Sequence, residues 1–387
     1  MKKKLFFVSL ALAGLFCLAS CSKDDEKKTE TKIEIADSEY DAIINQYVDG
    51  VVLPTYSDLL AKNKQLYNKV LDFGNNPSDG NFQAICNAWL AAREPWESSE
   101  AFLFGPVADF GLDPNMDSWP LDQEAIVGML SSQQWNAMEW TGDYDEDDET
   151  IAAVQGVRGF HTLEFLAFRD GKARTLNDVA SDNEAANVVY NANNATAWAQ
   201  YMRNTAKLLV DDATTLYNAW TTGGYGAKFK AHTGGDFTSG ISCIEQLIDG
   251  CIDIAGEVGD AKIGDPYKEY VAGNVVKALY AVESWYSWHS RDDYTNNIYS
   301  IRNAYYGSRD GSINANSLSK LVAKYNAALD TKVKTTIQAA ANAIQAIPQP
   351  FRNNINSQEA AAAMEACADL SDVLENELKP FLNNATK

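Results

Sequence analysis

Histidine is scarce in this chain of 387 residues, which has three: His161, His232 and His289. A zinc peptidase needs three protein ligands and an open position, and the sequence lacks the HExxH motif that supplies two of them. CxxC pairs and the GxSxG nucleophile turn are also missing, which argues against a thiolate metal site and that type of serine hydrolase. His232 lies in a glycine-rich segment and His289 has no motif-like partner, so His161 is the informative histidine.

Positive charge is also in short supply. Lys and Arg number 32 against 53 Asp and Glu, which gives a net charge of −21. Loss of residues 1–20 would remove three lysines and no acids, which moves the charge to −24. So acidic a chain repels nucleic acid and attracts cations. The charge therefore excludes nucleic-acid binding, disfavours capture of an acidic polysaccharide or peptide, and favours a metal ion or small polar ligand.

Long apolar runs are missing after residue 20. The one at the start, LFFVSLALAGLFCLA, follows Lys2, Lys3 and Lys4 and is typical of an export signal over residues 1–20. The end of this run continues into LASC, residues 18–21, which resembles a lipobox and predicts lipidation at Cys21; ordinary cleavage that leaves Cys21 unmodified is the alternative. Residues 21–36 are polar and predict a disordered tether. We expect an outer-membrane lipoprotein of the cell envelope, periplasmic or surface-exposed, that touches the membrane through its lipid alone.

Four cysteines remain after the anchor. On one helix, Cys243 and Cys251 would lie about 12 Å apart along the axis, too far for a disulfide. Export permits a bridge between Cys86 and Cys367, but nothing in the sequence demands it. Small buried hydrophobic side chains are the favoured interpretation for all four.

Alternating strand patterns are absent, and helical spacing runs through nearly the whole chain. The sequence predicts an all-α protein of two domains, residues 37–222 and 223–387, with the boundary in the glycine-rich segment 221–237. The clearest helical runs are residues 38–71 with an interruption at Pro54, residues 184–220, and residues 317–347, which end before Pro348.

Two ionisable groups lie on an apolar face. Residues 154–168 form a helical pattern whose apolar arc contains His161 and Glu164, while Arg158, Thr162 and Arg169 fall on the other side. Burial of His161 and Glu164 without partners would be unfavourable by several kcal/mol. We therefore expect them to face a site or a structural partner inside the protein.

Two further stretches repeat this pattern. In residues 82–103, Arg93, Trp96 and Glu100 lie on one stripe with other aromatics, and Pro95 predicts a kink. In the second half, Ser290, Asp293 and Asn297 share one helix face. Each group alone fits a structural salt bridge or a satisfied core polar group. Three together favour one shared ligand pocket. Its predicted members are Arg93, Trp96, Glu100, His161, Glu164, Ser290, Asp293 and Asn297.

A calcium loop is a weaker interpretation. Asp113, Asn115, Asp117 and Glu124 have the required spacing, but Ser118 replaces the glycine and Pro120 interrupts the loop. His161 and Glu164 with Glu100 or Asp293 make a better metal set. An oxygen-rich shell with one imidazole suits iron or another hard cation.

These residues carry a family resemblance. GFHTLEFLAF resembles the GxHxxE motif of the imelysin-like proteins, with Gly159, His161 and Glu164 at its fixed positions. AWLAAREPWESSEAFLFGP is similar to the family's Arg-x-x-Trp-x-x-x-Glu segment, DSWPLD to its Trp-Pro element, and SRDDYTNNIYSIRNAYYG to its Asp…Asn-Ile segment. The four motifs occur in the family's order, and the resemblance covers the chain from about residue 37 onward.

The resemblance implies two related four-helix domains with a polar pocket near their interface. It also implies an envelope protein linked to iron uptake, in a family historically classed as metallopeptidases. We therefore expect a lipid-anchored binding protein whose metal ligands are His161, Glu164 and Glu100 and whose cargo is iron or another divalent cation. A metallopeptidase using His161 and Glu164 is the alternative, followed by an acidic polysaccharide or peptide binder.

Overall fold

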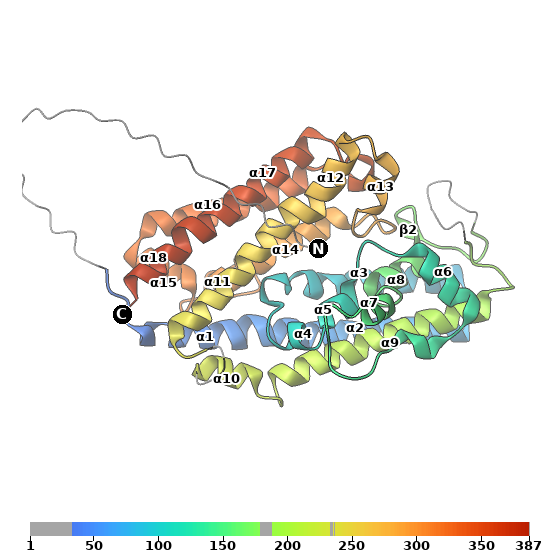
Figure 1. The fold of residues 1–387 in the computed structure, drawn as a ribbon, viewed down its shortest axis with the longest axis horizontal. Helices are drawn as coiled ribbons and strands as arrows, with labels where there is room; N and C mark the ends of the chain where they lie inside the picture. Colours follow the sequence, from blue (N-terminus) through green and yellow to red (C-terminus); the bar gives the residue numbers. More distant parts are fainter. Residues whose placement is uncertain (1–32, 179–187, 233–234, 236, 387) are drawn as a thin grey trace, which may run out of the picture. The chain divides into compact units, whose positions relative to one another are not determined.

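Helices make up nearly all of the regular structure in the computed structural model, which describes residues 33–178, 188–232, 235 and 237–386 (Figure 1). Within these residues the strands are β1 (Phe168–Arg169) and β2 (Lys172–Ala173), one short antiparallel pair. The all-α prediction is confirmed. Residues from Glu34 onward form one compact unit. The export signal, Cys21 and most of the tether lie outside the described residues.

The first part of the chain contributes two long helices and several short ones. With η marking 3₁₀ and π segments, the order is η1 (Asp37–Glu39), α1 (Asp41–Tyr47), η2 (Val48–Val52), α2 (Leu53–Asn75), α3 (Asp79–Glu97), η3 (Glu100–Phe102), α4 (Pro106–Asp109), α5 (Leu112–Asp117), α6 (Gln123–Ser132), η4 (Trp135–Met138), α7 (Glu149–Gln155), α8 (Gly159–Ala167) and α9 (Ala195–Trp220). The α2 helix packs along both α3 and α9. Its buried stripe includes Tyr56, Leu59, Leu66 and Phe73 at helical spacing.

The second part is a further set of packed helices. It comprises α10 (Tyr225–Ala231), α11 (Gly240–Glu257), η5 (Val258–Ile263), α12 (Gly264–Val271), α13 (Val275–Tyr280), α14 (Ser290–Tyr306), α15 (Leu318–Tyr325), α16 (Ala327–Ala346), η6 (Phe351–Asn353), α17 (Gln358–Val373), η7 (Leu374–Leu378) and α18 (Lys379–Ala385). The α16 helix packs on α17 and α14, and α11 packs on α14, α17 and η3. The α14 helix also packs against α3 and the turn η3 that follows it, and the candidate site lies between these elements.

The helix limits differ from the predicted runs at several places. In the run predicted over residues 184–220, α9 begins only at Ala195, and residues 188–194 are not helical. Ahead of Pro54 the chain does not break but changes to π spacing over Val48–Val52, because proline has no N–H to donate to the preceding turn. The run 317–347 is two helices, divided at Asn326, whose side chain caps α16. The glycine-rich segment 221–237 contains α10. The division into two domains at that segment stays a prediction.

The helix predicted over residues 154–168 is also two helices, α7 and α8. Gly159 starts α8 with φ +86°, and a Cβ there would lie 2.5 Å from the carbonyl oxygen of Met116. This contact breaks the run and presses α8 against α5. All nine residues of α8 are buried, including Thr162, which we expected on the opposite face; Arg158 and Arg169 are buried as well. The prediction of one exposed face was therefore wrong.

The four cysteines in the described part of the chain are buried and free. The prediction that Cys243 and Cys251 form no disulfide is confirmed, as is the interpretation of all four as small core residues. Among the described residues, no helix is both long and apolar enough to cross a membrane.

Candidate functional site: a buried carboxylate–histidine cluster

Helix α8 holds His161 and Glu164 one turn apart, and they contact each other. His161 Nδ1 lies 2.8 Å from Glu164 Oε2. The other oxygen, Glu164 Oε1, accepts hydrogen bonds from the backbone N–H groups of Tyr286 and Ser287, at 3.0 and 2.7 Å. A carboxylate that accepts from two amides is held as an acceptor, so His161 Nδ1 carries the proton between the two side chains. Glu164 thereby fixes the orientation of the imidazole.

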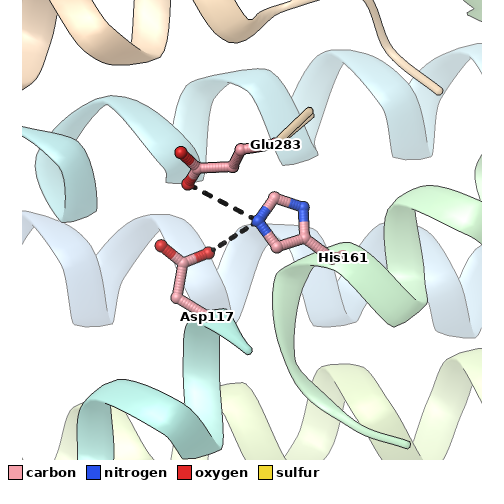
Figure 2. Close-up of side chains that lie close together, drawn as sticks. All are labelled: Asp117, His161 and Glu283. Atoms are coloured by element: carbon pink, nitrogen blue, oxygen red, sulfur yellow. Dashed lines mark ion pairs between the residues drawn. The ribbon is translucent and has the colours of Figure 1, made fainter. Parts of the chain in front are cut away.

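The other imidazole nitrogen faces two acids from separate parts of the chain (Figure 2). His161 Nε2 lies 3.1 Å from Asp117 Oδ1 and 3.6 Å from Glu283 Oε1. Asp117 ends α5, and Glu283 lies between α13 and α14. Two carboxylates and an imidazole lone pair would repel one another, so a proton or a cation is required between them. Burial disfavours the charged imidazole, but Asp117 and its hydrogen bonds outweigh this and raise the pKa of His161 well above its ordinary value.

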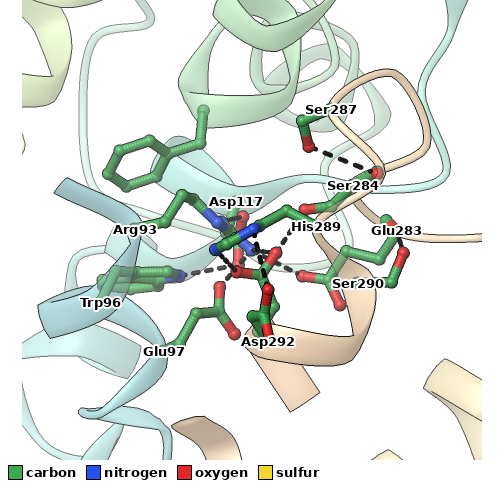
Figure 3. Close-up of polar contacts among 12 residues, drawn as sticks. Arg93, Trp96, Glu97, Asp117, Glu283, Ser284, Ser287, His289, Ser290 and Asp292 are labelled. Atoms are coloured by element: carbon green, nitrogen blue, oxygen red, sulfur yellow. Dashed lines mark hydrogen bonds and ion pairs between the residues drawn. The ribbon is translucent and has the colours of Figure 1, made fainter. Parts of the chain in front are cut away.

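Arg93 of α3 lies at the centre of the cluster (Figure 3). Its guanidinium contacts the carboxylates of Glu97 and Asp117, and it lies 2.9 Å from Glu283 and 3.5 Å from Asp293. Burial opposes its charge, but these acids, Asp117 foremost, raise the pKa of Arg93 well above its ordinary value. Arg93 is therefore a permanent cation that holds together four acids, from α3, α5, the turn before α14, and α14.

Residues of α14 and of the loop before it form the remaining side of the cluster. Asn297 Nδ2 donates to Glu97 Oε2 at 2.6 Å, and the Ser284 hydroxyl donates to Asp293. The Ser290 hydroxyl donates to the backbone carbonyl of Glu283 at 2.5 Å, which fixes the loop before α14. On α3, the indole N–H of Trp96 donates to Asp117 Oδ2 at 2.7 Å.

Lys262 is a second permanent cation in the cluster, after Arg93. It lies in the π segment η5, and its ammonium is 3.0 Å from Glu283 Oε2 and 3.6 Å from Glu257. Burial opposes its charge, but Glu283 and further acids raise the pKa of Lys262 well above its ordinary value. Lys262 thus links the buried cluster to Glu257, which is exposed.

Acids outnumber bases in the cluster. Five carboxyl groups are buried there, namely Glu97, Asp117, Glu164, Glu283 and Asp293. Arg93, Lys262 and a protonated His161 supply at most three positive charges. Burial disfavours the charged forms of Asp117 and Glu283, but nearby cations outweigh it. Arg93 and His161 lower the pKa of Asp117, and Lys262 foremost lowers the pKa of Glu283 to about 2.

At the other carboxyl groups with a shifted pKa, burial outweighs the attraction of nearby cations, and bound protons reduce the excess of negative charge. Burial raises the pKa of Glu97 well above its ordinary value, and it also raises that of Asp293, although Arg93 opposes both shifts. The cluster therefore contains more acidic than basic side chains, and a bound cation could replace the protons on these carboxyl groups.

Space next to the cluster is small on one side and larger on the other. A cavity of ≈ 20 Å³, about the size of one water, is lined by His161, Glu164, Glu283 and aromatic side chains. A cavity of ≈ 190 Å³ is lined by Glu100, Asp117 and Lys262 among others. A further cavity of ≈ 320 Å³, between α2 and α9, includes no member of the cluster and has no acidic side chain in its lining.

The structure brings most of the predicted pocket residues together. Arg93, Trp96, His161, Glu164, Asp293 and Asn297 contact other members of the cluster directly, and Ser290 does so through the backbone of Glu283. Glu100 lies not on the stripe of α3 but in the following turn η3. His232 pairs with Asp41 elsewhere. His289, for which the sequence shows no motif-like partner, lies 3.4 Å from Asp292 and 3.7 Å from Asp293.

The possible metal ligands group differently from the predicted set of His161, Glu164 and Glu100. Among the described residues, ligand atoms converge within 4.8 Å in two groups: Asp117, His161 and Glu283, and Glu97, Glu100 and Asp117. Glu164 is instead occupied with His161 Nδ1 and two amides. The acids that face His161 Nε2 come from other segments.

Sequence reasoning missed Glu97, Glu283, Ser284 and Lys262, and it considered Asp117 for calcium. The signal for Glu97 was its position four residues after Arg93, which places both on one helix face. The signal for Glu283 was a single acid among Tyr280, Val282, Trp285 and Tyr286. Lys262 carries no such signal, since a π segment follows neither the 3.6-residue nor the 2-residue period.

Helical packing around a buried carboxylate–histidine–arginine cluster defines a class of all-α proteins with a polar centre. The family model described as Imelysin matches residues 52–376, and the chain belongs to this family. Iron-regulated protein A of Synechococcus elongatus is 27% identical over 351 residues, which cover 88% of this chain and 86% of that one.

Solved structures agree with this assignment. The crystal structure named as an iron-regulated protein A precursor from Parabacteroides distasonis has a TM-score of 0.81 and 35% identity, and the match covers 91% of this chain and 97% of that one. An imelysin-like protein from Psychrobacter arcticum has a TM-score of 0.66 over 91% of this chain and 98% of its own. At 13% identity, the second structure supports the fold alone.

Proposed function

We propose that this protein binds a metal cation as cargo at His161 Nε2, Asp117 and Glu283. The observation that carries this proposal is the division of labour on His161: Nδ1 is tied to Glu164, while Nε2 faces two carboxylate oxygens. A histidine ligand is commonly oriented in this way, by a carboxylate on its other nitrogen. In this arrangement Glu164 is the orienting group and Asp117 and Glu283 are the ligands.

Iron is the cargo that the donor set and the relatives favour. Two carboxylate oxygens and one imidazole suit iron or another hard to borderline cation better than a structural zinc. The names of two similar proteins state that they are iron-regulated. We infer a role in iron acquisition at the cell envelope, in a protein held to the membrane by a lipid on Cys21.

Peptidase activity, the alternative, is less well supported by the geometry. Hydrolysis of a peptide bond needs an open metal position that a substrate chain can reach. His161 is 3% exposed, and the cavity beside it has room for about one water. An acidic polysaccharide or peptide would meet the same obstacle and the repulsion of the acidic chain.

The test is metal binding by a matched pair of variants. His161→Gln should reduce the affinity for Mn²⁺ or Fe²⁺ by at least about tenfold, because it removes the only nitrogen ligand. His232→Gln makes the same change at a histidine that pairs with Asp41 and should bind like the wild type. Calorimetric titration of chelator-treated protein measures both. Equal affinity in the two variants would refute this site.

A further inference from the structure

Glu100 is a buried acid that the proposed cation site leaves unused. It begins η3, directly after α3, and is 9% exposed. Among the described residues, no side-chain or backbone donor forms a hydrogen bond with its carboxylate, and no lysine or arginine lies within ion-pair distance. A carboxylate that is nine-tenths buried without a donor is energetically unfavourable unless a cation or proton accompanies it.

The Glu100 side chain lines open space on two sides. One cavity, ≈ 190 Å³, is bounded by Glu100, Asp113, Asp117, Glu257 and Lys262. The next, ≈ 200 Å³, shares Glu100, Asp113 and Glu257 with it and adds Asp253. Asp113, Asp253 and Glu257 are exposed. The two cavities thus form an acidic passage from the surface to Asp117, with room for a hydrated ion.

Two further carboxylates converge with Glu100. Oxygens of Glu97, Glu100 and Asp117 lie within 4.8 Å of one another. Arg93 forms ion pairs with Glu97 and Asp117 but, among the described residues, none with Glu100, so its charge offsets two of the three acids. Lys262, the cation whose field reaches Glu100, is already bound to Glu283. The cavity that Glu100 and Asp117 face is lined by Lys262 as well as by four acids, Glu100, Asp113, Asp117 and Glu257, so negative groups outnumber positive ones there.

We propose a second cation position, formed by Glu97, Glu100 and Asp117, that shares Asp117 with the His161 position. Its donors are all carboxylate oxygens, with water from the cavity to complete the shell, which suits a hard cation such as Mn²⁺, Ca²⁺ or ferric iron. This position adjoins the acidic passage, because Glu100 and Asp117 both line the cavity of ≈ 190 Å³. The shared Asp117 lets the protein hold two ions or pass one inward.

This inference rests on the proposed function through Asp117 alone, so its test must separate the two positions. Mn²⁺ is the probe, because it is hard and paramagnetic. Titration of the full chain in detergent, followed by calorimetry and electron paramagnetic resonance, should give two ions per chain with mutually broadened signals. Glu100→Gln should lose one ion and retain the other. The matched control is Glu94→Gln, an exposed acid on α3 paired with Lys62, which should retain both ions.

The outcomes distinguish the two claims. A single ion that His161→Gln abolishes and Glu100→Gln leaves unchanged would overturn the second position and retain the first. A single ion that Glu100→Gln abolishes and His161→Gln leaves unchanged would do the reverse. Two ions that are both unchanged in Glu100→Gln would also overturn the second position, and no binding at all would overturn both. Thermal melting of each variant confirms that it is folded.

Discussion

At the scale of single residues, the two nitrogens of His161 have different roles. Glu164, itself held by two backbone amides, fixes Nδ1 in one orientation, and Asp117 and Glu283 direct their charge at Nε2. When no metal is present, a proton on Nε2 is the simplest way to satisfy both acids. The metal and this proton therefore compete for one position.

We expect the metal-free protein to lose stability as pH rises, through His161. The folded-state pKa of His161 is raised well above its ordinary value, so the folded protein retains this proton where the unfolded chain, with a histidine pKa of about 6.5, has released it. The resulting stability is complete below about pH 6.5 and is lost as pH rises through the folded-state pKa. The free-energy difference between wild type and His161→Gln should therefore shrink above neutrality.

Urea unfolding with a chelator, at a series of pH values, measures this difference. Saturating Mn²⁺ should reverse the trend, because the metal occupies Nε2 and binds more tightly once the proton is gone. A difference that is flat or grows with pH in the chelated protein would show that His161 is neutral there. Another positive group would then have to neutralise Asp117 and Glu283.

At the scale of helices and strands, periodicity predicted the regular parts of the site and missed the irregular ones. Arg93 and Trp96 on α3 and Asp293 and Asn297 on α14 follow the 3.6-residue period, so their inward direction was readable. Asp117 ends a six-residue helix, and Glu283 lies in a turn. In such segments the period carries no information about direction, because long-range packing sets it.

The same limit explains the error at α8. The predicted wheel assumed a straight helix with one face in water, but Gly159 breaks the run and neighbouring elements bury α8 on every side. The backbone geometry at the start of α8 thus explains the glycine of the GxHxxE pattern. Its positive φ and its contact with Met116 let α8 approach α5, which places His161 against Asp117.

The second prediction is that Gly159→Ala damages both stability and the cation site. A non-glycine residue at φ +86° is strained by about 1–3 kcal/mol, and the new Cβ would lie 2.5 Å from the Met116 carbonyl oxygen. Relief of this clash must separate α8 from α5 and lengthen the distance from His161 to Asp117. We expect a loss of at least about 1–3 kcal/mol in the free energy of unfolding and weaker binding of Mn²⁺.

Gly128→Ala is the matched control, because Gly128 lies in α6 with nothing within 4 Å of a new Cβ. It should leave stability unchanged or raise it by up to about 1 kcal/mol, since alanine favours a helix over glycine. If Gly159→Ala behaved like this control, the close approach of α8 to α5 would not be what positions His161.

At the scale of the whole molecule, one buried cluster ties distant parts of the chain together. Arg93, Asp117 and His161 come from the first part, and Glu283, Asp293 and Asn297 come from the second, about 200 residues further along in the case of the Arg93–Asp293 pair. Acidic side chains are also in excess over the whole chain, which has a net charge of −21. This charge attracts cations toward the acidic passage and repels anionic surfaces.

The third prediction follows from this charge and concerns how the protein stays at the membrane. Helices of the described residues offer no membrane span, and removal of residues 1–20 would take the charge to −24, so the protein body should be repelled by anionic lipid headgroups. If Cys21 carries the lipid, Cys21→Ala should move the protein wholly into the soluble fraction. Low salt should not restore binding, since weaker screening strengthens the repulsion.

Cys86→Ala is the control at a buried thiol and should stay with the membrane. Membrane retention of Cys21→Ala in high-salt or carbonate washes would contradict the lipid anchor, and retention lost only at high salt would indicate attachment through a protein partner.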